Sequence, residues 1–173
     1  MSTLKVDSLV EKTSGNGVHI PGHSVNSEQH QWSSQTIVNS GSNPQGFVDC
    51  FGSDYTYVTK TSNSKIMITG IGMAYMSSGG ANGYGIGIFR GSTNIISPFA
   101  NWGLGPHSAG VTYGAVPWQI QVLDSPNVPA GTSLVYKLMV QLHTTGNSLY
   151  MNYGGTWNGL SNSSNFIFTE IAQ

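Results

Sequence analysis

The chain has 173 residues, which suits one domain with a short appendage, and its single Cys50 excludes a secreted domain held by disulfides. Its net charge is −1 with no basic stripe, and no run of about eighteen apolar residues occurs, so nucleic-acid binding and membrane insertion are excluded. Only 8% of its residues are charged, against about 25% in ordinary soluble domains, and so ion-poor a surface fits a subunit of a permanent assembly or an extracellular adhesive protein.

Residues 1–28 differ in composition from the rest of the chain. They contain a strong turn signal at 13–17 and a short apolar stretch closed by Pro-Gly, but too few large apolar residues to fold alone. We predict an extended arm that gains order by docking on another protein; a frayed terminus is the alternative. The candidate attachment residues are Leu4, Val6, Leu9, Val10, Val18 and Ile20. The segment has no apolar core of the Sec type, so we expect folding in a cytoplasm.

From Gln29 onward the sequence alternates short strands with turns. Strands are predicted at 31–39, 47–51 and 55–60, separated by segments rich in Gly, Ser, Asn and Pro. Cys50 lies between aromatic residues in the sequence FVDCFG, which is typical of a small buried core residue.

The stretch 64–76, SKIMITGIGMAYM, is the most apolar part of the chain and contains no proline. A strand here places Ile66, Ile68, Gly70, Gly72, Ala74 and Met76 on one face, and Met67, Thr69, Ile71, Met73 and Tyr75 on the other. Neither face is polar, so we predict a mid-sheet strand with a second sheet on one face and a neighbouring subunit on the other. The two glycines indicate a bulge or the close approach of another backbone or ring. A buried helix is the alternative.

The remaining chain continues the β pattern. We predict strands at 84–90, 116–123, 133–143, 149–153 and 166–171, with Pro117 suiting an edge strand or a strand start. The cleanest alternation puts Leu134, Tyr136, Leu138, Val140 and Leu142 on one face. Residues 98–112 read as a long loop of the kind that is functional or packs on a partner. Eight to ten short strands without a convincing helix predict an all-β, antiparallel, jelly-roll-like sandwich: an arm at 1–28 and a head at 29–173.

Several segments carry a resemblance to a known family. The opening STLKVDSLVEKTSGNGVHIPGH is similar to the N-terminal segment of virion fibre-type proteins of marine phages and cyanophages, and SKIMITGIGMAYMSSGGANGYGIGIFRGSTNI, VLDSP and PAGTSLVYKLMVQ follow in the expected order. The resemblance implies a structural protein on the phage virion surface: a tail fibre, a spike, or a capsid fibre or decoration protein. Such proteins are usually trimers with interlocked N-terminal arms and β-sandwich heads. This chain departs from the pattern because it has no long shaft, which favours a short fibre or a decoration protein.

Metal binding and catalysis find little support. A trimer could bring three copies of His19, His23 or His30 to its axis, but no Cys or acid completes a ligand set, so we expect plain polar side chains and no metal. Asp49 and Asp54 flank a turn without implying glycosidase geometry, and no Gly-x-Ser-x-Gly elbow occurs. We therefore predict no catalytic residue and no cofactor.

Loops rich in Asn, Gly and Ser carry rings and an amide that could recognise a sugar. These candidates are Trp102, His107, Tyr113, Tyr153, Trp157 and Asn158. Aromatic faces beside amide groups suit sugar CH faces and hydroxyls. The alternative is that these rings pack over the ends of the sandwich or in a subunit contact.

Together these observations favour a non-enzymatic, homotrimeric phage surface protein. It would be synthesised in the cytoplasm of the host bacterium, lie on the virion surface, and bind other capsid or tail proteins through its arm. The trimer seam is predicted along Met67, Ile71, Met73 and Tyr75, because the apolar area there exceeds what one sandwich can bury. The alternative is a carbohydrate-binding receptor-recognition module at a tail-fibre tip that binds a host surface glycan; an enzyme of unknown type is a third hypothesis.

Overall fold

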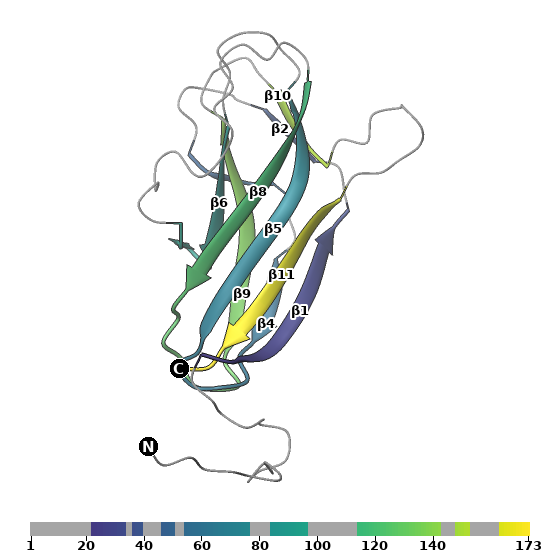
Figure 1. The fold of residues 1–173 in the computed structure, drawn as a ribbon. Helices are drawn as coiled ribbons and strands as arrows, with labels where there is room; N and C mark the ends of the chain where they lie inside the picture. The colour runs from purple at the N-terminus through teal and green to yellow at the C-terminus, as the bar shows by residue number, and fades with distance from the viewer. Residues whose placement is uncertain are drawn as a thin grey trace, which may run out of the picture.

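The computed structural model describes residues 22–33, 36–39, 46–50, 54–76, 84–96, 114–142, 148–152 and 163–173. Every regular element among them is a β-strand, and the strands form two antiparallel sheets that pack face to face (Figure 1). Within the described residues there is no helix that could cross a membrane. The helix alternative for residues 64–76 is therefore wrong, and the all-β prediction is confirmed.

Sheet A contains β1 (Ser24–Trp32), β2 (Thr36–Asn39), β5 (Lys65–Met76), β8 (Gly114–Asp124), β10 (Ser148–Met151) and β11 (Ser164–Ile171). β5 is central, with β8 along one side and β11 and β10 end to end along the other. β1 and β2 continue this arrangement, since β1 pairs with β11 and β2 pairs with β10. Sheet A is therefore four strands wide over most of its length.

Sheet B contains β3 (Val48–Asp49), β4 (Tyr55–Val58), β6 (Tyr84–Arg90), β7 (Thr93–Asn94) and β9 (Ser133–Leu142). β9 is central: β3 and β4 share one side of it and β6 lies on the other. β7 forms a hairpin with β6.

The strand order is that of a jelly roll. If β1 with β2, β3 with β4, and β10 with β11 are each counted as one strand, the eleven described strands become eight. Sheet A then has the order 1-8-3-6 and sheet B the order 2-7-4-5, the interleaving that two Greek keys produce in a double-sheet jelly roll. The predicted architecture is confirmed.

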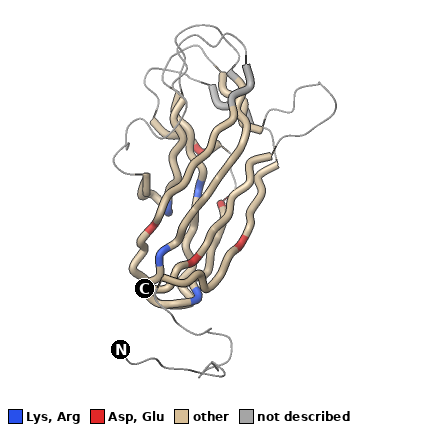
Figure 2. The backbone as a smooth tube through the Cα atoms, in the orientation of Figure 1, with Lys and Arg blue, Asp and Glu red and all other residues tan. Residues whose placement is uncertain are grey.

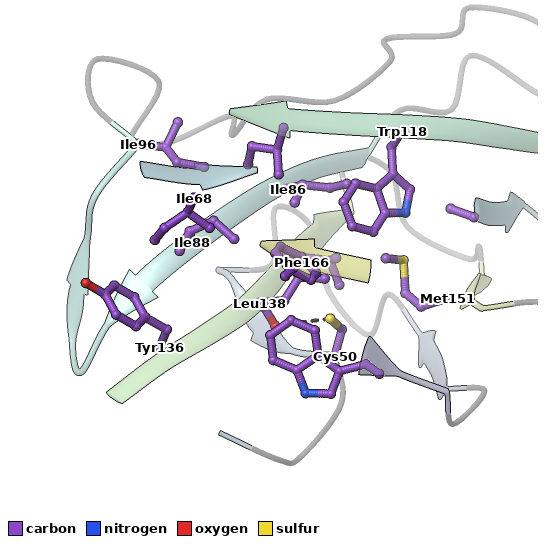
Figure 3. Packing of buried hydrophobic residues seen from close by; sticks show 14 of the residues in the cluster. Cys50, Ile68, Ile86, Ile88, Ile96, Trp118, Tyr136, Leu138, Met151 and Phe166 are labelled. Atoms are coloured by element: carbon purple, nitrogen blue, oxygen red, sulfur yellow. Dashed lines mark hydrogen bonds between the residues drawn. The ribbon is translucent and has the colours of Figure 1, made fainter. Parts of the chain in front are cut away.

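The core lies between the sheets and follows the predicted alternation. Ile66 and Ile68 of β5 are fully buried, as are Phe166 and Phe168 of β11 to within 1%. They join the same core cluster as the buried face of β9, which consists of Leu134, Tyr136, Leu138, Val140 and Leu142. Figure 3 shows Ile68, Phe166, Tyr136 and Leu138 of this cluster. The alternation of β9 and the inner face of β5 were both predicted correctly.

The two glycines of β5 make room for rings. A Cβ added at Gly70 would overlap the ring of Phe166, and one at Gly72 would overlap the indole of Trp118. Both rings lie in the core (Figure 3). The predicted close approach of a ring is confirmed, and side-chain packing rather than turn geometry explains why glycine occupies these positions.

Cys50 is a buried core residue, as predicted. Its side chain is fully buried, and Sγ donates a hydrogen bond to the carbonyl oxygen of Leu138 at 3.0 Å (Figure 3). Burial, reinforced by the charge of Asp49, raises the pKa of the thiol well above its ordinary value. A thiol in this state is unreactive towards oxidants and alkylating agents.

The first strand differs from the prediction. β1 begins at Ser24, so the predicted boundary between arm and head falls inside it, and the predicted strand at 31–39 is two strands interrupted after Trp32. β1 is polar on both faces, which is why alternation did not reveal it. Its start is fixed by backbone bonds from Gly22 N to the Ala172 oxygen and from Ala172 N to the His23 oxygen. The predicted attachment residues between Leu4 and Ile20 lie outside the described residues.

Candidate assembly interface

The outer face of sheet A, turned away from sheet B, is here called face A. The strand register gives three rows across β1, β11, β5 and β8. The rows are Ser27, Thr169, Met67 and Leu123; then Gln29, Ile167, Thr69 and Gln121; then Gln31, Asn165, Ile71 and Gln119. Met73 and Tyr75 continue face A along β5. The period of two along each strand places all these side chains opposite the core.

Face A exposes large aliphatic side chains. Ile71 is 52% exposed, Ile167 46% and Leu123 45%, the three highest values for large apolar residues in the described part of the chain. The predicted seam residues Met67, Ile71, Met73 and Tyr75 all lie on this face. Ile167 and Leu123 were not predicted at the seam, because only the register across strands brings them beside β5.

None of the twelve side chains in the three rows is charged. Figure 2 shows the described charged residues gathered mainly in the half of the sandwich that contains the C-terminus. The polar groups of face A are amides and hydroxyls, and they form ladders between β1 and β11. Gln31 Nε2 donates to Ser163 Oγ at 2.6 Å, and Ser27 Oγ lies 3.3 Å from Thr169 Oγ1.

An open groove runs along face A. Its larger part has a volume of about 510 Å³ and is here called the Met73 groove. It is lined by Ile71, Gly72, Met73, Pro117, Trp118, Gln119, Ser163 and Asn165. A second hollow of about 370 Å³ adjoins it and shares Ile71 and Asn165. Pro117 lies in β8, which pairs with β5 alone among the described strands, in keeping with its predicted edge position.

One residue fixes the sheet where its outer strands are interrupted. Asn152 has a left-handed backbone (φ 55°), and its amide N–H donates to the Met73 oxygen at 3.1 Å. Its side-chain Nδ2 donates to the Trp32 oxygen at 2.7 Å, and Ser164 Oγ donates to its Oδ1 at 2.6 Å. Asn152 therefore joins the ends of β1, β10 and β11 to β5 in the interior of sheet A.

The charged half of the sandwich contains two carboxylates that close the core. The register places Glu170 and Asp124 on either side of Ile66, all three directed inward. Glu170 is fully buried and accepts hydrogen bonds from Lys60 N (2.8 Å), Thr61 N (2.8 Å) and the Tyr57 hydroxyl (2.9 Å). Burial by itself would raise its pKa, but these donors hold it below the ordinary value.

Asp124 is paired rather than solvated. The Arg90 guanidinium donates to both of its carboxylate oxygens at 2.8 and 2.9 Å, and the Tyr136 hydroxyl donates at 2.8 Å. Burial, together with the neighbouring charge of Asp124, raises the pKa of Tyr136. Hydrogen-bond donors of the chain itself bind both carboxylates. This arrangement is typical of structural rather than catalytic acids.

Other predicted sites meet different outcomes. The candidate sugar-binding residues from Trp102 to Asn158 lie outside the described residues, as does His19. Among the described residues no group of three or more His, Cys, Asp or Glu could hold a metal ion. Asp54 pairs with Lys137 Nζ at 3.3 Å. His30 packs its ring on Tyr55 and Trp32, each at a centroid distance of 4.6 Å.

Comparisons with known proteins extend these observations only a little. No protein-family model and no curated protein sequence matches the chain. It is similar to the solved structure of infectious bursal disease virus, Gx strain, with a TM-score of 0.45 and 13% identity over 96% of this chain and 42% of that chain. It is also similar to the VP2 subviral particle of that virus, with a TM-score of 0.45 and 12% identity over 87% and 39%. The chain spans about two-fifths of either one, and at these TM-scores the likeness carries no argument about function.

Proposed function

We propose that the chain is a non-enzymatic structural protein of a phage virion, exposed on the particle surface as a short trimeric fibre, spike or capsid decoration. The observation that carries the proposal is face A. The sandwich has a core of its own, yet Ile71, Ile167 and Leu123 remain exposed in three rows of face A that contain no charged side chain. Such a surface favours association, and monomeric proteins rarely leave one uncovered.

The virion context comes from the sequence. The opening segment resembles that of phage fibre-type proteins, and in the proposal its residues Leu4 to Ile20 attach the protein to the capsid or tail. The described chain starts beside its own C-terminus, where Gly22 N bonds to the Ala172 oxygen. Attachment at that end would leave the opposite end of the sandwich, where β5 ends at Met76, directed away from the particle.

The area of face A limits how much surface it can bury in the proposed assembly. Four strands about 4.8 Å apart and about eight residues long at about 3.4 Å each give roughly 500 Å² per subunit. A contact between two such faces buries about 1,000 Å², the lower limit of specific interfaces, whereas obligate assemblies bury above about 2,000 Å². In the proposal the arms supply the remainder.

The first test of the proposal is the mass in solution. Light scattering of the full chain at micromolar concentration should give a trimer of about 55 kDa, three times 18.4 kDa. A monomer at that concentration would overturn the proposal. An electron cryomicroscopy map of the particle with the chain located in it then tests the virion assignment.

A second candidate is a carbohydrate-binding receptor-recognition module. Jelly rolls also serve as lectin domains, which is the observation that favours it. Loss of adsorption to host cells or glycan arrays on Trp102→Ala or Trp157→Ala, with the assembly intact, would support recognition. Loss of particle binding on removal of residues 1–21 would support attachment by the arm.

A further inference from the structure

One edge of the sandwich is closed by polar side chains. β1 forms the edge of sheet A, and among the described strands it pairs with β11 alone (Figure 1). Its inward side chains reach β4 of sheet B. The Tyr55 hydroxyl donates to Glu28 Oε2 at 2.5 Å. Asn26 Nδ2 donates to the Tyr57 hydroxyl at 3.1 Å. This β1–β4 contact is therefore made largely by groups that water can satisfy when β1 separates from sheet B.

His30 lies within the β1–β4 contact. The centroid of its ring is 4.6 Å from that of Tyr55 and 4.6 Å from that of Trp32. Its Nε2 atom is buried and has no hydrogen-bond partner among the described residues. In the imidazolium both ring nitrogens carry a proton, so protonation would leave a buried, charged N–H group without an acceptor. The closed contact therefore favours the neutral ring, and burial lowers the pKa of His30 accordingly.

The charges described around His30 do not offset this cost. Glu28 precedes it by two residues on the same face of β1, but the carboxylate oxygens accept hydrogen bonds from a hydroxyl of β4 and an amide of β1. The other titratable groups of the packed strands are Tyr55 and Tyr57 of β4, Glu170 of β11 and, just before β4, Asp54 with its partner Lys137. Each carboxylate among them is bound by donors of the chain, and burial rather than a nearby charge determines how the ring titrates.

We propose that the β1–β4 contact is acid-sensitive: the neutral ring of His30 holds β1 against sheet B, and protonation of the ring favours a locally open form in which β1 has separated. Among the side chains of β1 only Trp32 belongs to the buried core, so this strand can open at a smaller cost than the whole sandwich. The open form hydrates the imidazolium and uncovers the ring of Phe166, which packs on Trp32 at a centroid distance of 4.6 Å. The proposal does not depend on the proposed assembly, because every contact that it uses lies within one chain.

Hydrogen exchange of the full chain measures this opening. Protection of the backbone amides of residues 26–31 is compared at pH 7.5 and pH 5.5, each relative to an unstructured peptide at the same pH. We expect protection to fall by a factor of about two to ten, the upper limit being set by the ordinary histidine pKa of about 6.5 in the open form. Amides of β9, at the centre of sheet B, should remain at least about a hundredfold better protected at both pH values. Equal protection of β1 and β9 would show that the strand opens only by global unfolding and would overturn the proposal.

Variants assign the effect to the ring. His30→Phe keeps a ring of similar size and does not titrate, His30→Gln is a second non-titrating variant, and both should abolish the dependence on pH. His23→Phe is the matched control, since His23 is exposed just before β1 and its removal should leave the dependence unchanged. Glu28→Gln should also leave it unchanged, because glutamine still accepts the hydrogen bond from Tyr55. The proposal is overturned by no fall in the parent chain, by an undiminished fall in both His30 variants, or by loss of the fall in Glu28→Gln.

Discussion

The two faces of β5 are built from similar residues but have opposite surroundings. On the inner face Ile66 and Ile68 are fully buried, and Gly70 and Gly72 lie against rings of neighbouring strands. On the outer face Ile71 is 52% exposed, and the three rows of side chains from Met67 to Ile71 contain no charge. Apolar composition therefore does not distinguish a face that is buried within the chain from one that remains exposed and that we propose joins it to a partner. What distinguishes the two faces is whether other residues of the same chain pack against them.

This contrast separates two kinds of substitution. Changes on the inner face should lower the stability of a single chain, while changes on the outer face should weaken association and leave single-chain stability almost unchanged.

Gly72→Val should have the largest effect on folding. The new side chain would overlap the Trp118 indole and Ser164 Oγ, so we expect a loss of about 3 kcal/mol or more in the free energy of unfolding. Urea denaturation measures it. Gly46→Ala is the matched control, since an added Cβ there meets nothing within 4 Å. A loss of less than about 0.5 kcal/mol for Gly72→Val would contradict the inner-face assignment.

Glu170→Gln should cost about 2 kcal/mol, because two backbone N–H groups lose a charged acceptor in a buried site. Lys60→Ala is the control, since it keeps the backbone donor. The pKa of Glu170 is lower in the folded state, so its contribution is present above the unfolded value of about 4.3 and is lost as the pH falls through the folded value. Stability measured from pH 6 to pH 3 should fall less in the variant than in the parent chain.

Ile71→Asp should weaken association at least tenfold, which corresponds to about 1.4 kcal/mol, because it puts a charge in the centre of face A. Single-chain stability should change by no more than about 0.5 kcal/mol, as for other exposed positions. Val58→Asp on sheet B, where the side chain is 38% exposed, is the control and should leave association unchanged. Equal weakening of association by both variants would show that face A is no more important for association than the outer face of sheet B.

His30 should give the smallest effect. Burial lowers the pKa of its ring, which packs between Tyr55 and Trp32. The folded state therefore favours neutral imidazole, and the stability from this preference is complete above about pH 6.5 and declines below it. Melting temperatures at pH 7.5 and pH 5.5 should differ by a few degrees at most, and His30→Phe should abolish the difference. A larger pH effect in the variant would contradict this account of the ring.

Much of the fold was predictable from local periodicity. Alternation identified the buried face of β9, the two faces of β5 and the paired orientation of Phe166 and Phe168. Local periodicity does not reveal contacts that depend on register between distant segments. Glu170 has an inward position in its strand, but its hydrogen-bond partners at Lys60 and Thr61 lie about 110 residues earlier in the chain.

The same limit applies to the candidate interface. The four predicted seam residues do share face A, because they lie on one strand with a period of two. Ile167 is about 100 residues away and joins them only through the pairing of β11 with β5. Gln29 and Gln31 on β1 were likewise invisible, since a polar edge strand has no apolar period to detect. Gln119 and Gln121 alternate with the buried Trp118 and Ile120 of β8, but only the pairing of β8 with β5 places them on face A.

The most direct test of the central claim is the mass of the full chain in solution, measured by light scattering at micromolar concentration before and after Ile71→Asp. The account predicts a mass near 55 kDa that falls towards the 18.4 kDa of a single chain in the variant. A mass of 18.4 kDa for both proteins, with Ile71 exposed to water in a stable monomer, would contradict it.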